Sequence, residues 1–206
     1  MPKVSQQYKN NKRDHLISVA EQVFIRLGYA KATMEDILQE AEVSRGGIYL
    51  YFHNKAEIFE AVLERQDQKF LKELEEMCVS SDPIGLQLIN LAIPSPEYLN
   101  ETNRRWIAMV VEYHLAHRDD PKRRTKIFAR FDRVKQQFSR VIQVGIDRGE
   151  LHPRLSIPSI VQFIISAQDG WAISAAVQGY ERADLEEHAQ ALHFFLQESL
   201  GISSNS

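Results

Sequence analysis

The chain of 206 residues lacks most of the features that mark membrane proteins and secreted proteins. Its single cysteine, Cys78, cannot form a disulfide within one chain, which favours a reducing cytoplasm. No run of about 18 apolar residues occurs, so no membrane-spanning helix is expected. The basic N-terminus is not followed by the apolar segment of a secretion signal. We therefore expect a cytoplasmic protein that does not enter a membrane.

Sequence motifs of common enzymes are absent as well. G-x-S-x-G, a Walker phosphate loop and H-E-x-x-H do not occur. His114 and His117 have a spacing that can place two imidazoles on one helix face, which suits a metal ion, but no third ligand accompanies them. We interpret both as surface histidines and predict a protein that is not an enzyme and holds no metal or cofactor.

The overall charge, formally −3, does not by itself indicate a nucleic-acid partner. Its distribution is more informative. Residues 1–55 carry eight Lys or Arg against six Asp or Glu, a net charge of +2, which leaves −5 for the rest of the chain. A basic end favours contact with a polyanion there. Residues 1–13 are either a solvated tail or an arm that touches DNA.

Apolar residues recur at helical spacing along the chain, and no stretch alternates for long with a period of two, so we predict an all-α fold. The first helix should end at Leu27, before Gly28. Breaks are expected at Ser80–Pro83 and Pro94–Pro96. The later helices are expected from a cap at Asn54 to Met77, over Ile84–Leu91, from Pro96 to Arg118, from a cap at Asp120 with Pro121 in the first turn to Gly149, over Ile160–Val177, and in a last helix capped by Asp184 and Glu187. A loop is expected over Leu151–Pro158.

The stretch Thr33–Phe52 has the pattern of two short helices joined by a tight turn. Thr33 is a suitable N-cap, and Asp36 lies where the reciprocal partner of a capping box belongs. Ser44 is a second N-cap, before a helix expected over Arg45–Tyr51. That helix starts with an arginine and free N–H groups, which suit a polyanion. We interpret the stretch as a DNA-reading helix-turn-helix.

The segment from Ala20 to Glu57 resembles the DNA-binding domain of the tetracycline-repressor (TetR) family of bacterial regulators. The resemblance is carried by Phe24, Gly28-Tyr29, Thr33, Val43-Ser44, Tyr49, Phe52 and Lys55, all in register. It implies an N-terminal three-helix DNA-binding domain over residues 1–55 and a C-terminal helical ligand-binding and dimerisation domain over residues 56–206.

Three positions depart from the family pattern. Glu42 stands where the family usually has Gly, Leu38 where it has Ala, and Tyr51 where His is commonest. A glutamate in a left-handed turn position costs on the order of 1 kcal/mol.

Residues of the expected recognition helix divide into two roles. Arg45 can grip a guanine bidentately, and Leu50 can touch a thymine methyl. Gly46 and Gly47 have no side chain that would hold the helix away from the floor of the groove, so they allow close approach to DNA. The alternative is that they form a weak first turn without a functional role. The resemblance implies phosphate contacts from Tyr49, Tyr51 and Lys55, and we add Thr33 and Ser44 at the helix N-termini. The alternative for Tyr49 is core packing.

The last two helices suit a homodimer, because the first of them is apolar almost all round and must be buried on more than one side. The resemblance implies a four-helix bundle formed by two such pairs. We predict interface positions at Trp171, Ala175, Leu192 and Phe195, with filling of the monomer core as the alternative.

The middle helices are expected to enclose a ligand pocket. Its predicted walls are aromatic, soft or polar side chains at helical spacing: Trp106, Met109, Tyr113, Phe128, Phe131, Phe138, Gln168 and Asp169. Plain core packing is the alternative for each aromatic residue. Buried polar groups need partners, and a small molecule can supply one.

These observations predict a homodimeric DNA-binding transcriptional regulator, a repressor that a small-molecule inducer releases from a palindromic operator in double-stranded DNA. The alternative is a non-specific DNA-binding or protein-interaction module without an inducer pocket.

Overall fold

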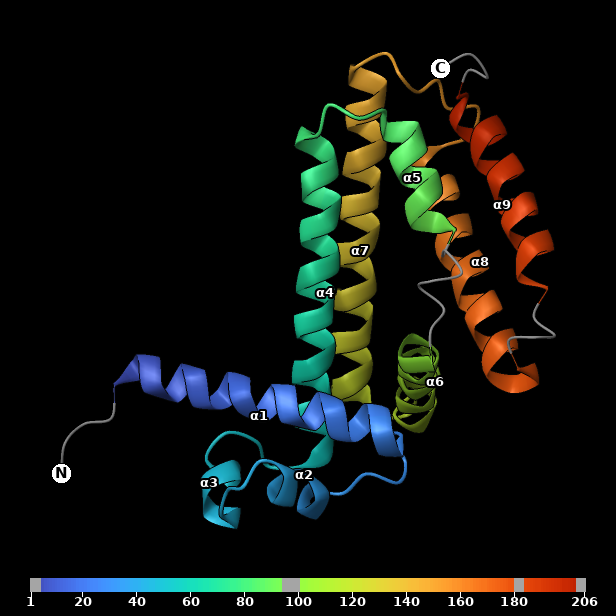
Figure 1. Cartoon of the computed structure of the whole chain (residues 1–206). Helices are drawn as coiled ribbons and strands as arrows, with labels where there is room; N and C mark the ends of the chain where they lie inside the picture. Colours follow the sequence, from blue (N-terminus) through green and yellow to red (C-terminus); the bar gives the residue numbers. More distant parts are fainter. Residues whose placement is uncertain (1–4, 94–100, 180–183, 203–206) are drawn as a thin grey trace. The chain divides into compact units, whose positions relative to one another are not determined.

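A computed structural model describes residues 5–93, 101–179 and 184–202 of the chain. Within these residues it contains nine α-helices and no strand, which confirms the predicted all-α fold. The predicted break at Pro94–Pro96 lies outside the described residues, as do residues 1–4 of the predicted arm. Figure 1 labels the helices, which are α1 (Gln6–Leu27), α2 (Met34–Glu40), α3 (Arg45–Tyr49), α4 (Lys55–Val79), α5 (Ile84–Ala92), α6 (Glu101–Ala116), α7 (Pro121–Asp147), α8 (Ile157–Gln178) and α9 (Leu185–Leu200).

The chain forms two compact units, Met1–Lys69 and Phe70–Ser206. The first holds α1, α2, α3 and the beginning of α4. The second holds the end of α4 and the remaining helices. One continuous helix, α4, therefore belongs to both units.

The first unit is built around the apolar face of α1. Leu16, Ala20 and Phe24 of that face are fully buried, because the spacing of four residues keeps them on one side of the helix. The Phe24 ring meets the Phe59 ring of α4 edge-on, with centroids 5.1 Å apart, and the Tyr29 ring lies 4.8 Å from Phe59. This aromatic cluster joins α1 to α4 and forms the support on which the two short helices rest.

The segment expected as a solvated tail or a DNA-touching arm up to residue 13 is helical from Gln6 onward, which corrects the solvated-tail alternative for those residues. Ser5 caps this helix, and its Oγ accepts the N–H of Tyr8 at 3.2 Å. Side-chain amides one turn apart also bond to each other, Gln6 to Asn10 and Gln7 to Asn11. Local hydrogen bonds of this kind extend a helix beyond its buried part.

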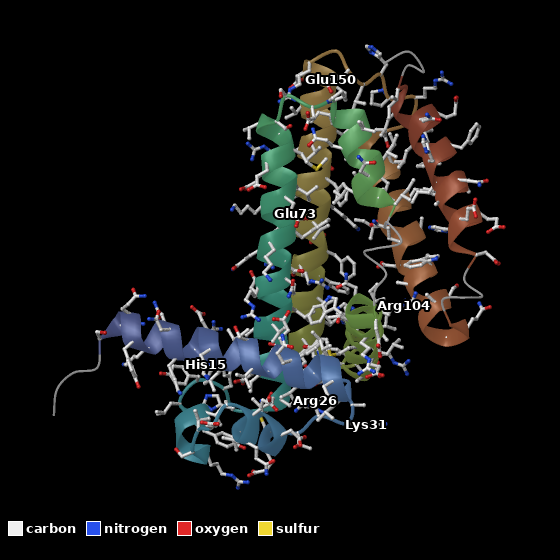
Figure 2. All side chains as sticks on the ribbon, in the orientation of Figure 1. His15, Arg26, Lys31, Glu73, Arg104 and Glu150 are labelled. Atoms are coloured by element: carbon white, nitrogen blue, oxygen red, sulfur yellow. The ribbon has the colours of Figure 1, made fainter. Side chains whose placement is uncertain are left out.

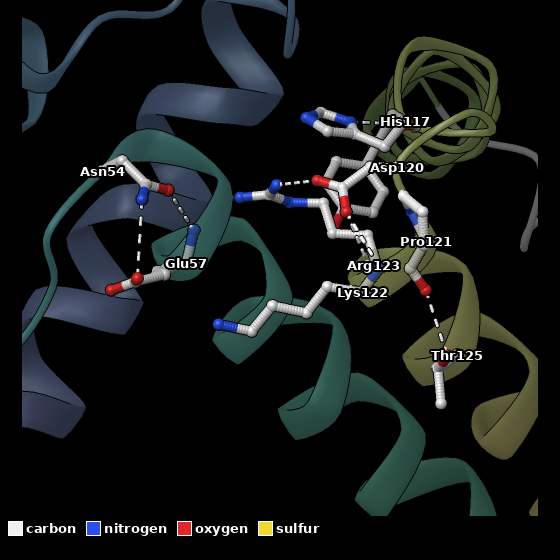
Figure 3. Close-up of polar contacts among 9 residues, drawn as sticks. Asn54, Glu57, His117, Asp120, Pro121, Lys122, Arg123 and Thr125 are labelled. Carbon is white, nitrogen blue, oxygen red and sulfur yellow. Dashed lines mark hydrogen bonds and ion pairs between the residues drawn. The ribbon is translucent and has the colours of Figure 1, made fainter.

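The junction between α3 and α4 is set by Asn54 and Glu57 (Figure 3). The Asn54 side-chain oxygen accepts the N–H of Glu57 at 3.0 Å, as a cap requires. The Glu57 carboxylate accepts the N–H of His53 at 2.9 Å, one residue earlier than a regular capping box places it. The chain therefore turns sharply into α4 with its first N–H groups satisfied.

The second unit has one apolar core beneath α5. Leu74 of α4, Leu88 of α5 and Phe138 of α7 are all fully buried in it, and α8 and α9 complete its walls. Gly145 of α7 packs closely against the loop that follows the helix, where an added Cβ would lie 2.5 Å from Cδ1 of Leu151. Glu150, labelled in Figure 2, accepts the N–H of Ile84 at 2.6 Å and so caps the start of α5 from the end of α7.

The predicted cap of α7 is confirmed. The Asp120 carboxylate accepts the N–H groups of Lys122 and Arg123 at 3.0 and 3.2 Å, with Pro121 in the first turn (Figure 3). The predicted cap of α9 is wrong, because Asp184 makes no capping hydrogen bond and has a left-handed φ of 41°.

Other helix boundaries differ from the predicted ones by a few residues. α3 ends at Tyr49 rather than Tyr51, and α6 ends at Ala116 rather than Arg118. α8 starts at Ile157, because Ser156 caps it by accepting the N–H of Ser159. Pro158, expected in a loop, therefore lies in the first turn of this helix, where its missing N–H is not needed.

Candidate nucleic-acid interface

The two short helices α2 and α3 are held by local caps and a strained turn. Thr33 and Asp36 form the predicted capping box: the Asp36 N–H donates to the Thr33 hydroxyl oxygen at 3.2 Å, and the Thr33 N–H donates to the Asp36 carboxylate at 2.8 Å. The hydroxyl and the N–H of Thr33 hold the pKa of Asp36 below its usual value. Glu42, in the turn, has a φ of 51°, the left-handed conformation expected for the position. The capping box therefore fixes the start of α2, and the left-handed Glu42 lies in the turn between α2 and α3.

One face of α3 anchors it to the first unit. Ile48 is fully buried and Phe52, just after the helix, is almost so. The guanidinium of Arg13 in α1 lies 5.3 Å from the centre of the Phe52 ring. The spacing of four residues between Ile48 and Phe52 leaves the residues between them pointing outward.

The outward face of α3 is open and carries most of the predicted DNA-contacting residues. Leu50 is 82% exposed and Tyr49 38% exposed, so Tyr49 is not a core residue, whereas Tyr51 is half-buried. A Cβ added at Gly46 would meet no atom within 4 Å, so nothing inside the protein requires glycine there. This face can approach another molecule closely.

Arg45 forms an exposed ion pair that the sequence did not predict. Its Nη2 donates to Oε2 of Glu35 in α2 at 3.2 Å. Ten residues and a turn separate the two, so no helical spacing signals the contact. Asp36 already accounts for an acidic residue in the first turn of α2, so no local sequence signal singles out Glu35.

Three predicted phosphate contacts already have partners within the chain. The Thr33 hydroxyl donates to Asp36 at 2.6 Å, and Ser44 Oγ accepts the N–H of Gly47 at 3.2 Å. The Lys55 ammonium donates to the carbonyls of Tyr29 and Ala30 at 2.7 and 3.2 Å and lies 4.6 Å from the centre of the Tyr29 ring. In this structure Lys55 holds the turn after α1 against the start of α4.

The residues predicted to line a pocket separate into different environments. Met109 and Tyr113 of α6 are buried, and Trp106 and Phe131 are half-buried. Phe138 packs against Phe70 in the main core of the second unit, with ring centroids 5.9 Å apart. Phe128 is 59% exposed, so within one chain it does not face an enclosed space.

The predicted polar groups of the pocket also differ in their surroundings. Gln168 of α8 donates to the carbonyl of Ala92 at 3.1 Å, so the end of α5 supplies the partner for which the sequence suggested a ligand. Asp169 is on the exposed side of α8, where partial desolvation raises the pKa of its carboxyl and Arg130 opposes that shift.

Two polar side chains, Arg130 and His114, meet between α6 and α7. Nη1 of Arg130 is 3.5 Å from Nε2 of His114, whose ring also approaches Phe131. Burial, and secondarily the charge of Arg130, lower the pKa of His114 to about 4. His114 is therefore a neutral, half-buried side chain at pH 7 rather than the surface histidine that the sequence suggested.

Of the predicted dimer positions, three are buried in the single chain. Leu192 is part of the core of the second unit, and Trp171 and Ala175 are buried. Phe195 is half-buried and stacks on Phe163 of α8, with ring centroids 3.9 Å apart. The exposed apolar residues of α8 and α9 are instead Phe163, Ile173, Val177 and Phe194. Phe163 lies on an open surface of α8 together with Pro158, Ser159, Gln162 and Ser166.

In the described part of the chain, no three His, Cys, Asp or Glu residues gather as a metal site would require. Among the same residues, no helix is both long enough and apolar enough to cross a membrane.

A capped helix-turn-helix with an exposed second helix, supported by a third helix and followed by a helical domain, defines the class of helix-turn-helix regulators. Residues 16–62 match the family described as bacterial regulatory proteins, tetR family, and residues 94–186 match the tetracyclin repressor-like C-terminal domain. The chain belongs to the TetR family of transcriptional regulators.

Relatives match over nearly the whole length. The HTH-type transcriptional regulator YfiR of Bacillus subtilis is 28% identical over 196 residues, which is 95% of each chain. The structure of GusR from Salmonella enterica has a TM-score of 0.74 at 16% identity and covers 96% of this chain and 98% of that one. FadR from Bacillus subtilis, solved in complex with stearoyl-CoA, has a TM-score of 0.63 at 21% identity and covers 92% and 99%. At these identities, the two solved structures bear on the fold alone.

Proposed function

We propose that this TetR-family protein is a cytoplasmic, dimeric, non-enzymatic repressor that leaves a palindromic operator when a small molecule binds. The observation that carries the proposal is the outward face of α3. Arg45, Gly46, Tyr49 and Leu50 are open to solvent there, while Ile48 and Phe52 anchor the helix from behind. A helix held in this way can enter a major groove without losing its support.

Within this face we assign base reading to Arg45 and Leu50, with Gly46 and Gly47 allowing close approach. We assign phosphate contacts to Tyr49 and Tyr51, and to the helix starts at Thr33 and Ser44. Lys55 has the same predicted role, but its ammonium must first leave the carbonyls of Tyr29 and Ala30. Its effect on DNA affinity should therefore be smaller than that of Tyr49.

A dimer is needed because a five-residue helix reads only a few base pairs. Two half-sites about 34 Å apart place two such helices on one side of the duplex. The exposed phenylalanines of α8 and α9, Phe163 and Phe194, support a second copy of the chain as the partner of this surface. Phe195, stacked on Phe163, stays among the predicted interface residues.

The inducer is proposed to act through the second unit and α4. Helix α4 is continuous from the DNA-binding unit into the second unit, so a ligand that favours one setting of its end also affects its start. The proposed site lies around Trp106, Met109, Tyr113 and Phe131, beside the polar pair of His114 and Arg130. FadR, a neighbour in fold, was solved in complex with stearoyl-CoA, and we propose by analogy that this protein also binds a small molecule. Ligand and operator must then weaken each other by the same factor.

Selection of bound fragments from random DNA by the purified protein, at near-physiological salt, tests the proposal. We expect a palindrome with two half-sites. Arg45→Ala should relax the choice at particular bases by about 1–3 kcal/mol, whereas Tyr49→Ala should weaken binding to all sequences alike. A folded, dimeric protein that enriches no sequence would contradict the proposal and favour a non-specific or protein-binding module.

A further inference from the structure

Glu35 holds the side chain to which we assign base reading. Its Oε2 lies 3.2 Å from Nη2 of Arg45, and the two side chains are 58% and 76% exposed. An ion pair this exposed adds little to folding stability. Folding stability therefore does not account for this contact.

A carboxylate beside a DNA-reading residue also has an electrostatic cost, because it repels the phosphates that a DNA-binding surface attracts. The N-terminus of α2 does favour a negative charge, but Asp36 already supplies one there, in the capping box with Thr33. Helix capping thus accounts for Asp36 and leaves the position of Glu35 against Arg45 unexplained.

The pairing restricts what Arg45 can do. An arginine released from Glu35 can reach any nearby phosphate, which strengthens binding to every sequence equally. The Glu35 contact engages one Nη2 donor out of the five that a guanidinium carries. Enough donors remain for the two bonds to O6 and N7 of a guanine.

We propose that Glu35 is a specificity-determining residue of this regulator: it orients the Arg45 guanidinium toward one base and keeps it from non-specific phosphate contacts. This inference rests on the proposed function. Glu35 acts here as a positioning residue, through Arg45, and does not itself need to touch a base.

The test compares the wild type with Glu35→Gln, Arg45→Ala and the double variant. Binding is measured by fluorescence anisotropy on three duplexes across a salt series. These are the operator obtained by selection, the same operator with the Arg45-dependent base pair changed, and a scrambled duplex. Glu42→Gln is the matched control, because it removes an equal charge three residues before Arg45, in the turn. Circular dichroism checks that every variant keeps its helices.

For Glu35→Gln we expect non-specific affinity to rise severalfold, with a salt-dependence slope steeper by about one released counterion. The ratio of affinities for the operator and for the operator with the Arg45-dependent base pair changed should fall by roughly tenfold. An oriented bidentate contact to a base contributes about that much discrimination. Glu42→Gln should leave discrimination unchanged. In the Arg45→Ala background, Glu35→Gln should have no further effect on discrimination.

Two results would overturn the inference. One is unchanged discrimination in Glu35→Gln. The other is lost preference at a base pair that Arg45→Ala does not affect, which would make Glu35 itself a base reader. Failure of the proposed function is a separate result, since the wild type would then select no sequence at all.

Discussion

Two adjacent glycines in a reading helix are unusual residues for their place, because glycine weakens a helix by about 1 kcal/mol relative to alanine. Packing inside the protein does not require glycine at either position. A Cβ at Gly46 would meet open space, and one at Gly47 would touch Ser44 Oγ at 3.4 Å. Neither glycine has the left-handed φ that Gly28 and Gly149 have. The explanation we favour lies outside the chain, in close approach to DNA.

Gly46→Ala separates folding from DNA binding. The free energy of unfolding should rise by about 0.5–1 kcal/mol, because alanine is the better helix former and the space is open. Operator affinity should fall at the same time, since the new methyl group lies between α3 and the groove. Urea unfolding and anisotropy titration measure the two effects. A more stable protein with unchanged affinity would mean that Gly46 does not face the DNA.

At the scale of elements, the DNA-binding unit depends on how α1 is joined to α4. The Glu21 carboxylate of α1 accepts hydrogen bonds from Arg65 and Gln66 of α4, and Arg65 also donates to Ser18 Oγ at 2.7 Å. The Arg65 and Glu21 side chains are largely shielded from solvent, so the loss of one partner should cost more than it does in an exposed pair. Any movement of α4 should therefore carry α1 with it.

Glu21→Gln should lower the free energy of unfolding by about 2 kcal/mol, because the hydrogen bonds from Arg65 and Gln66 lose their charged acceptor and the Arg65 charge loses its ion-pair partner. Glu40→Gln is the control. It breaks the exposed pair of Glu40 with Arg26, 2.7 Å apart, and should change stability by less than about 0.5 kcal/mol. Arg26 lies toward the C-terminal end of α1 in Figure 2. Equal effects of the two substitutions in urea unfolding would show that burial adds nothing to the Glu21 contacts.

At the scale of the whole molecule, the proposed function requires two chains. Phe194 on α9 is 68% exposed, and we place it in the dimer interface. Phe194→Glu should yield a folded monomer in sedimentation experiments. This monomer should lose most of its operator affinity, because a single recognition helix reads only one half-site. Phe128→Glu alters another exposed ring, on α7, and should leave the dimer intact. A dimer that survives Phe194→Glu would place the interface elsewhere.

Stability of the whole chain should also depend on His114 in mildly acidic solution. The pKa of His114 is lowered from 6.5 to about 4 in the folded protein, first by burial and then by Arg130. Between these values the unfolded chain binds a proton that the folded chain does not, so stability falls as the pH drops through this range.

His114→Gln should remove that part of the decline, on the order of 2 kcal/mol between pH 7.5 and pH 5. Urea unfolding of the wild type and the variant at both pH values measures it. The same decline in both proteins would show that other groups cause it.

The sequence by itself determined the features that depend on neighbours three or four residues away. The helical periodicity, the capping box of Thr33 and Asp36, the cap at Asp120 and the left-handed Glu42 were all predicted. The register of the helix-turn-helix followed from the same spacing. Asp184 is the local signal that failed, since its left-handed conformation makes no cap.

Only the tertiary structure decided which distant side chains meet. In it, Gln168 donates a hydrogen bond to the carbonyl of Ala92, Lys55 donates to the carbonyl of Tyr29, and Arg45 donates to the carboxylate of Glu35. It also buried Leu192 in the core and left Phe194 exposed, although both are apolar residues of one helix. The physical reason is range: a cap or a turn is complete within one helical turn, whereas these partners depend on how separate helices pack.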